Sequence, residues 1–260
     1  PSPEVLKKAV EILRSGGCVA FATETVYGLG ADISSEDGLR AIFELKGRPQ
    51  TDPLIVHVAA AAELSLIVEE VPEVAKILIE RFWPGPLTLI LKKKPTVSPL
   101  ITAGLETVAV RSPKHPVAQQ LLKALGGPIA APSANRFQSI SPTTAEAVEK
   151  ELGSSLLILD GGASHDGLES TVISLVGKPS VLRLGAVTLE QLSEVFDEPP
   201  HLSTAAERAE HLPQVSPGQL DFHYAPKTSL RFVSNFEALE QQGAVDKITT
   251  YLLVFSNRER

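Results

Sequence analysis

Hydroxyl, carboxyl and glycine residues follow one apolar run near the N-terminus, in the stretch Thr23–Gly30 with the sequence TETVYGLG. The apolar run itself, Cys18–Ala22, is typical of a buried strand. Sixteen positions after the glycine-rich stretch, a helix-like segment ends on Lys46, Gly47 and Arg48. Polar strand ends, and basic side chains at a helix end beside a tight turn, are typical places for an anionic ligand. The two segments together predict a site for a small anion, with phosphate as the best fit.

Two more cations, Arg111 and Arg183, directly follow apolar runs. A lone arginine is more often a solvated surface group, but strand ends on one side of a twisted sheet can converge on a cleft. Arginine binds phosphate or carboxylate through a planar fork, whereas lysine supplies a point charge. We therefore treat Lys46, Arg48, Arg111 and Arg183 as one candidate group.

A second strand-to-turn stretch rich in hydroxyl groups runs from Ala131 to Asn135, and Ser141 and Pro142 follow it. Serine before proline is a good start for a helix, which predicts Ser141 as an N-cap. The same helix N-terminus would also hold an anion through its free N–H groups. Ser170 precedes a β-branched strand and His57 lies within one; either residue alone is more often structural than ligand-binding.

Standard signatures for nucleotide and metal sites do not occur. Gly28 and Gly30 are followed by Ile33, where a dinucleotide fingerprint needs its third glycine. The dipeptide Gly177-Lys178 lacks the upstream glycine of a P-loop. The six histidines show no metal-ligand spacing.

The 260 residues are 43% hydrophobic, which is enough for one good-sized core and at most a small second unit. A net charge of −7 does not favour a nucleic-acid polyanion, although a phosphate pocket needs only two or three cations. The single cysteine, Cys18, is predicted to be buried, and a disulfide within the chain is impossible. No apolar run reaches the ~18 residues of a membrane span. These features predict a cytoplasmic protein that does not bind a membrane.

Hydrophobic periodicity predicts a mixed succession of helices and strands. The regular alternation of a parallel βαβ fold is missing, which favours an α/β (in some schemes α+β) fold with a twisted mixed sheet. The expected helices are one that ends before Gly16, then 36–46, 60–68, 72–82, 116–125 and 142–151. The expected strands are 18–22, 53–58, 87–91, 107–110, 129–131, 155–159, 171–175 and 180–184.

The C-terminal part differs in character. Four prolines and four acidic residues between positions 197 and 220 are typical of a linker. The segment 227–260 has a strand, helix, strand pattern but is too short to bury a core alone. We predict a main domain at 1–195, a linker at 196–226 and part of a second domain at 227–260.

In combination, these segments resemble the YrdC-type threonylcarbamoyl-AMP synthase family. The resemblance covers about residues 4–190, in order, and its longer two-domain branch also accounts for SPG (216–218) and HYAP (223–226). The matching segments are TETVYGLG (23–30), KGRP…PLIVH (46–57), FWPGPLT (82–88), TVAVR (107–111), HP (115–116), APSANR…SPT (131–143), GLESTV (167–172) and LRLG (182–185).

The resemblance implies a YrdC-like fold, a linker over the active site and a partial Rossmann-like second domain. It also implies a nucleotidyltransferase that makes threonylcarbamoyl-adenylate and pyrophosphate from L-threonine, bicarbonate and ATP. The product would serve threonylcarbamoyladenosine formation in tRNA, so tRNA is an indirect partner through downstream transferase proteins. Mg²⁺ is expected with ATP, and no tightly bound metal held by the protein.

The family's site residues can be carried over to matching positions. Lys46 and Arg48 would be catalytic, as the cations nearest the phosphates. The L-threonine contacts would be Thr25, His57, Arg111, Ala131 and Ser170. The ATP contacts would be Arg48, Asp52, Thr107, Ser133, Ser141, Arg183 and Tyr224.

Two positions depart from the family pattern. Asp52 stands where the family often has asparagine or lysine, and a carboxylate near triphosphate is unfavourable unless Mg²⁺ intervenes. Phe137 and Gln138 replace a usual Ser-Gly pair. Two other functions stay open: an ATP- or RNA-binding module without this activity, and a carbamoyl-adenylate-forming maturation enzyme. The latter class carries cysteine-rich zinc motifs, which one cysteine cannot supply.

Overall fold

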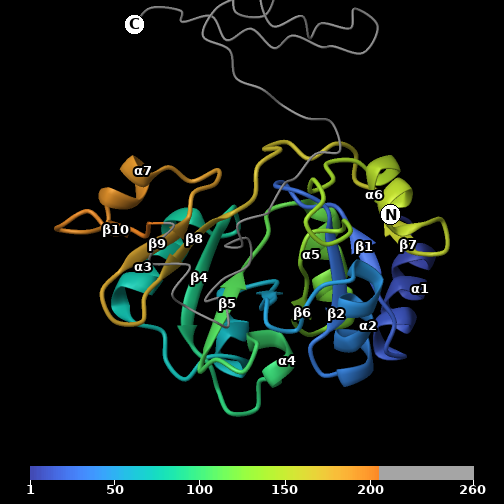
Figure 1. Cartoon of the computed structure of the whole chain (residues 1–260), viewed down its shortest axis with the longest axis horizontal. Coiled ribbons are helices and arrows are strands. Elements are labelled where there is room, and N and C mark those ends of the chain that lie inside the picture. The colour runs from blue at the N-terminus through green and yellow to red at the C-terminus, as the bar shows by residue number, and fades with distance from the viewer. Residues whose placement is uncertain (205–260) are drawn as a thin grey trace, which may run out of the picture. The chain divides into compact units, whose positions relative to one another are not determined.

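The computed structural model describes residues 1–204, in which strands and helices build one mixed α/β unit (Figure 1). The strands form a single sheet in the order β10-β9-β8-β4-β5-β3-β6-β2-β1-β7. Parallel pairs, such as β3 with β5, stand beside antiparallel pairs, such as β4 with β5. The predicted twisted mixed sheet is therefore confirmed. The strands are β1 Val19–Phe21, β2 Gly28–Asp32, β3 Ile55–His57, β4 Leu87–Lys92, β5 Thr107–Arg111, β6 Ile129–Ala130, β7 Leu157–Leu159, β8 Thr171–Ser174, β9 Ser180–Arg183 and β10 His201–Leu202.

Helices flank this sheet, and their ends follow capping rules. The helix α2 begins after Ser35, whose side chain accepts a hydrogen bond from the Gly38 N–H. It ends at Lys46 because Gly47 takes a left-handed conformation with φ 64°, which glycine adopts without strain. The chain thereby turns sharply between Lys46 and Arg48. The helices are α1 Pro3–Arg14, α2 Glu36–Lys46, η1 Ala61–Leu66 (3₁₀), α3 Glu73–Phe82, α4 Pro99–Thr102, α5 Pro116–Leu125, α6 Ala145–Leu152 and α7 Leu189–Ser193.

Strand register separates the main core from the face that carries the candidate site. Val56 and Val110 pair across β3 and β5 and belong to the main hydrophobic core. Successive side chains of a strand point to opposite faces, so the flanking pairs lie on the other side of the sheet. One of these is Ile55 with Ala109, and the next is His57 with Arg111. Ile55 and Ala109 join a small second apolar cluster, so the polar pair borders an apolar floor.

Strand β2 is not among the elements predicted from the sequence. Its residues Gly28-Leu29-Gly30-Ala31-Asp32, for which the sequence pattern predicts no element, pair antiparallel with both β1 and β6. Glycine is needed here for close packing rather than for a turn. A Cβ atom at Gly30 would lie 2.7 Å from Cγ2 of Ile129 and 2.8 Å from Cε1 of Phe21.

The predicted helix 142–151 begins later than expected. Helix α6 starts at Ala145, and its N-cap is Thr144, whose side chain accepts from the Ala147 N–H. The prediction of Ser141 as an N-cap is therefore wrong. The Ser141 hydroxyl instead donates to Oε1 of Glu169 at 2.8 Å.

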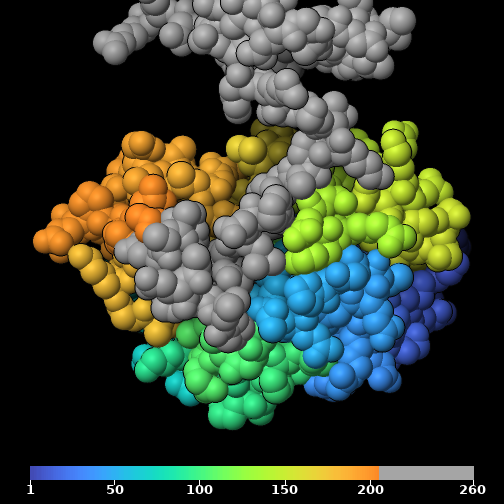
Figure 2. Space-filling model, viewed as in Figure 1, coloured from blue at the N-terminus to red at the C-terminus, as the bar shows by residue number. Residues whose placement is uncertain are grey.

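Figures 1 and 2 show how the described elements are distributed. Strands β8, β9 and β10 and helix α7, coloured yellow to orange, lie at one side of the view, and α1, α2 and α6 lie at the other. The same division appears on the surface, with orange atoms at the left edge of Figure 2 and blue to lime atoms at the right. Within residues 1–204, no helix has the length and apolar character to cross a bilayer.

Candidate functional site

One open cleft contains most of the residues singled out from the sequence. It encloses about 470 Å³, including the solvent at its mouth. Four strands and four connecting segments supply its lining: strands β2, β3, β5 and β9, the segments after β1, α2 and β6, and the segment before β8. The lining residues are Thr23, Thr25, Val26, Tyr27, Gly28, Arg48, Ile55, His57, Arg111, Ala131, Pro132, Ser133, Glu169, Ser170 and Arg183.

Each of the three arginines that line the cleft forms an ion pair with a carboxylate. Arg111 pairs with Glu24, Arg48 with Asp52, and Arg183 with Glu169. Buried charges need such partners because the desolvation penalty is otherwise large. The cleft is therefore rich in planar donors for anions without carrying three uncompensated charges.

Arg111, the last residue of β5, has a guanidinium group held from three directions. Its Nε donates to the carbonyl oxygen of Gly85 at 3.1 Å, and its Nη1 donates to Oγ1 of Thr25 at 2.9 Å. Its Nη2 lies 2.8 Å from Oε1 of Glu24. The fork is thus fixed at the boundary between the β-sheet and the Thr23–Val26 segment.

Arg48 reaches the cleft from the turn after α2. Its Nε donates to the main-chain oxygen of Asp52 at 3.1 Å, and its Nη2 donates to that of Pro53 at 2.7 Å. Nη2 also lies 3.0 Å from Oδ1 of Asp52. Burial raises the pKa of Asp52, although the charges of Arg48, Lys46 and Arg183 oppose the shift.

Arg183, the last residue of β9, is the centre of a further polar group. Its Nε and Nη2 donate to the main-chain oxygen and the hydroxyl of Ser170, each at 3.1 Å. It also forms an ion pair with Glu169, which accepts a hydrogen bond from Ser141. The Ser170 hydroxyl lies 2.8 Å from that of Thr88. Two β-strands and the segment before α6 are thereby joined at one rim of the cleft.

Lys46 lies behind the cleft rather than on its surface. Its Nζ donates to the main-chain oxygens of Ser133, at 2.6 Å, and Asn135. The Asn135 side-chain oxygen is a third acceptor at 3.4 Å. Burial, together with the charge of Arg48, lowers the pKa of Lys46 to about 7. The lysine therefore fixes the turn that carries Ser133 into the cleft.

His57 is a neutral group at neutral pH. Burial and the charge of Arg111 lower its pKa to about 3. Its Nδ1 lies 3.2 Å from the carbonyl oxygen of Ile55, and its ring meets the edge of Phe21 at 6.0 Å between centroids. An uncharged imidazole next to Arg111 can form a hydrogen bond with a ligand without adding charge to the site.

The structure brings most of the residues predicted from sequence to the cleft, and leaves some outside its lining. Asp52 is buried behind Arg48, and Ser141 reaches the cleft only through Glu169. Thr107 begins β5, four residues before Arg111, and faces Lys92 on β4. Tyr224 lies outside the described residues. The predicted residues that line the cleft are Thr25, Arg48, His57, Arg111, Ala131, Ser133, Ser170 and Arg183.

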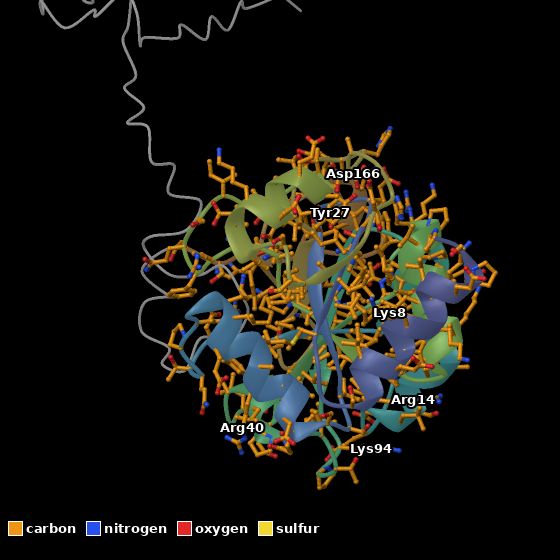
Figure 3. The ribbon with its side chains drawn as sticks, turned by 90° about the vertical axis from the view of Figure 1, so that its right-hand side faces the viewer. Lys8, Arg14, Tyr27, Arg40, Lys94 and Asp166 are labelled. Atoms are coloured by element: carbon orange, nitrogen blue, oxygen red, sulfur yellow. The ribbon has the colours of Figure 1, made fainter. Side chains whose placement is uncertain are left out.

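Sequence reasoning did not assign three residues that shape the site, namely Glu24, Glu169 and Tyr27. The Tyr27 hydroxyl lies 2.9 Å from Oδ1 of Asp160 and 2.8 Å from the carbonyl oxygen of Gly162. Figure 3 shows Tyr27 inside the molecule, at the same end as Asp166 and away from the peripheral Arg40 and Lys94. The sequence signal for these residues was their place within the quoted motifs. Spacing alone does not reveal that Glu24 pairs with Arg111, because the two residues are 87 positions apart.

Metal ligands do not gather at the cleft. In the part of the chain that the structure describes, no three histidine, cysteine, aspartate or glutamate side chains are placed to share a metal ion. Cys18 is buried, and burial raises the pKa of its thiol to about 12.

Two family models match the sequence and together cover most of it. The model Sua5_yciO_yrdC, described as Telomere recombination, matches residues 11–185. The model Sua5_C, described as Threonylcarbamoyl-AMP synthase, C-terminal domain, matches residues 187–259.

Individual proteins named threonylcarbamoyl-AMP synthase are similar to the chain. The threonylcarbamoyl-AMP synthase of Bacillus subtilis is 47% identical over 228 residues, which cover 86% of this chain and 65% of that protein. The threonylcarbamoyl-AMP synthase of Pyrococcus abyssi is 42% identical over 249 residues, covering 94% and 69%. The crystal structure of P. abyssi Sua5 complexed with L-threonine superposes with a TM-score of 0.82 and 43% identity, covering 86% of this chain and 66% of that one. The chain thus spans about two thirds of the length of the curated relatives that it matches.

Proposed function

The chain belongs to the Sua5/YciO/YrdC family, which includes the threonylcarbamoyl-AMP synthases of B. subtilis and P. abyssi, and we propose that it has this activity. L-Threonine, bicarbonate and ATP would be converted to threonylcarbamoyl-AMP, pyrophosphate and water. The product would supply the threonylcarbamoyl group for threonylcarbamoyladenosine in tRNA. The tRNA itself would be reached through downstream transferase proteins.

The reaction needs positioning and charge neutralisation more than a protein nucleophile. The amino group of threonine captures CO₂ or bicarbonate, and an oxygen of the resulting carbamate attacks the α-phosphorus of ATP. Pyrophosphate leaves with the electron pair of the broken P–O bond. Cations placed around the phosphates and a fixed amino acid are the groups that accelerate such a transfer.

The amino-acid half of the site would consist of Thr25, His57, Arg111 and Ser170 with the main chain at Ala131. The Arg111 fork suits a carboxylate, because planar guanidinium groups bind carboxylates with two parallel hydrogen bonds. His57, next to Arg111, is neutral, so Arg111 supplies the positive charge for that carboxylate and His57 adds none. The L-threonine bound in P. abyssi Sua5 supports an amino-acid subsite of this kind.

The nucleotide half would use a larger set of groups. Arg48 and Lys46 would be the catalytic cations. Arg48 lines the cleft and would contact the phosphates, whereas Lys46 lies behind it and holds the turn at Ser133. Mg²⁺ would enter as part of the nucleotide substrate, where it would offset part of the negative charge of the phosphates. The ATP contacts that we propose are Arg48, Asp52, Thr107, Ser133, Ser141, Arg183 and Tyr224.

One observation carries this proposal: a single cleft is lined both by Arg111 and by Arg48 with Arg183. A mixed anhydride between a carbamate and AMP can form only where an amino acid and a nucleotide lie side by side.

We also propose a domain division into a catalytic domain at 1–195, a linker at 196–226 and part of a second domain at 227–260. The Sua5_C match over 187–259 supports a distinct C-terminal part.

The activity can be tested by pyrophosphate release from ATP with each substrate omitted in turn. Release should require both threonine and bicarbonate. Equal release without threonine would refute the proposed reaction. Nucleotide or RNA binding without any turnover would favour a binding module instead.

A further inference from the structure

Glu24 lies in the first polar segment of the sequence but has no role in the function proposed so far. Its Oε1 lies 2.8 Å from Nη2 of Arg111, and the two side chains are only 10% and 4% exposed. Glu24 is absent from the residues that line the cleft, whereas Arg111 lines it. Glu24 therefore contacts the arginine without itself lining the cleft.

The carboxylate of Glu24 is itself held in place. Its Oε2 accepts a hydrogen bond from the His115 N–H at 3.3 Å. Its main-chain oxygen accepts from the Asp166 N–H at 2.8 Å, which ties the segment to the loop before β8. Although burial opposes ionisation, the charge of Arg111 holds the pKa of Glu24 below its usual range. The group is an anchored anion at neutral pH.

Glu24 and Thr25 are adjacent in sequence and bind neighbouring nitrogens of the same guanidinium group. Thr25 accepts from Nη1, and the Gly85 carbonyl oxygen accepts from Nε. A long arginine side chain otherwise has many rotamers, and ordering it on ligand binding would cost affinity. The three contacts fix the fork before a ligand arrives. Of the three, only Glu24 supplies a charge.

We infer that Glu24 is a positioning residue, which holds the Arg111 fork in the orientation that receives the carboxylate of the amino-acid substrate. The inference rests on the proposed function, because it assigns that carboxylate to Arg111. It predicts that Glu24 contributes to recognition of the substrate carboxylate without touching it. A residue needed only for packing would not distinguish a charged from a neutral substrate.

The test compares L-threonine with L-threoninamide, in which a neutral amide replaces the carboxylate. Calorimetric titration gives the affinity of each for the full chain and for Glu24→Gln and Glu24→Ala. A non-hydrolysable ATP analogue, titrated in parallel, reports whether each variant remains folded and competent. Glu73→Gln is the matched control, because it removes a glutamate from the exposed ion pair with Lys76 on α3.

The preference of the wild type for threonine over threoninamide should fall at least tenfold in Glu24→Ala and less in Glu24→Gln, which can still accept a hydrogen bond. Affinity for the ATP analogue should stay within about twofold, and Glu73→Gln should match the wild type. Provided that the wild type binds threonine, an unchanged preference or tighter threonine binding in Glu24→Ala would overturn the inference. If Glu24→Ala does not fold, the Glu24→Gln preference decides alone. A wild type that binds neither compound would instead overturn the proposed function, and this inference with it.

Discussion

Nη2 of Arg48 lies 3.0 Å from Oδ1 of Asp52, in an ion pair whose two side chains are almost completely buried beside the cleft. Arg48 is therefore a buried, paired cation and not an unpaired surface cation. It is fixed to the 52–53 segment, and any phosphate that binds it must share it with a carboxylate. This relationship sets the expected behaviour of both residues.

Removing Arg48 should reduce both stability and use of ATP, and the two effects can be separated. Arg48→Ala leaves the Asp52 carboxylate buried without its cation, which typically costs about 3–5 kcal/mol. The double variant Arg48→Ala/Asp52→Asn removes both charges and should recover much of that loss. In the double variant, the KM for ATP should rise about tenfold or more while threonine affinity stays within about twofold. Urea unfolding and steady-state kinetics measure the two effects, and a folded double variant with normal kinetics would exclude Arg48 from the nucleotide site.

Asp52→Asn alone should tighten nucleotide binding. The substitution removes a negative charge next to the proposed triphosphate and keeps an oxygen that can accept from Arg48. Because burial raises the pKa of Asp52, the wild-type carboxyl takes up a proton at a higher pH than an ordinary aspartate. The gain in affinity for an ATP analogue should therefore be several-fold at pH 8 and shrink as the pH is lowered. Weaker binding by the variant at pH 8 would indicate that the carboxylate assists the nucleotide.

His57 should make the fold sensitive to acid. Its folded-state pKa of about 3 lies below its ordinary value of 6.5, so the unfolded chain binds an additional proton between these values. Acid then favours unfolding, and stability rises with pH through that window. Between pH 6 and pH 4, the free energy of unfolding of the wild type should fall by about 1 kcal/mol per pH unit more than that of His57→Asn. Parallel pH profiles from chemical denaturation would contradict a buried neutral histidine.

Gln138 provides a test of local backbone strain. It has φ 67°, a left-handed conformation that costs a non-glycine residue about 1 kcal/mol or more. Gln138→Gly should therefore raise the free energy of unfolding by about 0.5–1 kcal/mol. Gln138→Ala is the control, because it removes the side chain but keeps the Cβ atom, and it should bring no gain. Equal stability changes in the two variants would assign the effect to the side chain rather than to the backbone.

The sequence predicts where the cations in and behind the cleft lie, because each stands at or next to a recognisable element end. Arg111 and Arg183 are the last residues of β5 and β9, and Lys46 is the last residue of α2. The proposed roles of these cations come from the family resemblance. Because side chains alternate between the two faces of β3 and β5, the paired residues His57 and Arg111 share one face. The left-handed φ of Gln138 is a conformation that favours glycine, the residue that the resemblance leads us to expect at that position.

Other features depend on contacts that local patterns do not contain. Strand β2 could not be predicted from local pattern, because its Gly30 is required by the close approach of the Phe21 and Ile129 side chains on neighbouring strands. Ser141 is a good N-cap by sequence, yet Glu169 takes its hydroxyl group and the helix begins three residues after Pro142. Two of the carboxylate partners, Glu24 and Glu169, could not be predicted, because they lie in other segments of the chain than their arginines.

The central claim is that one cleft joins a carbamate made from threonine to the adenylate of ATP. The most direct measurement follows ¹⁴C from bicarbonate and ³²P from the α-phosphate of ATP into products, in the presence of L-threonine. We expect both labels in one compound, formed in equal amount to the pyrophosphate released, and neither label in it when threonine is omitted. Labels in separate compounds, or formation of ADP and phosphate in place of AMP-linked product and pyrophosphate, would contradict the account.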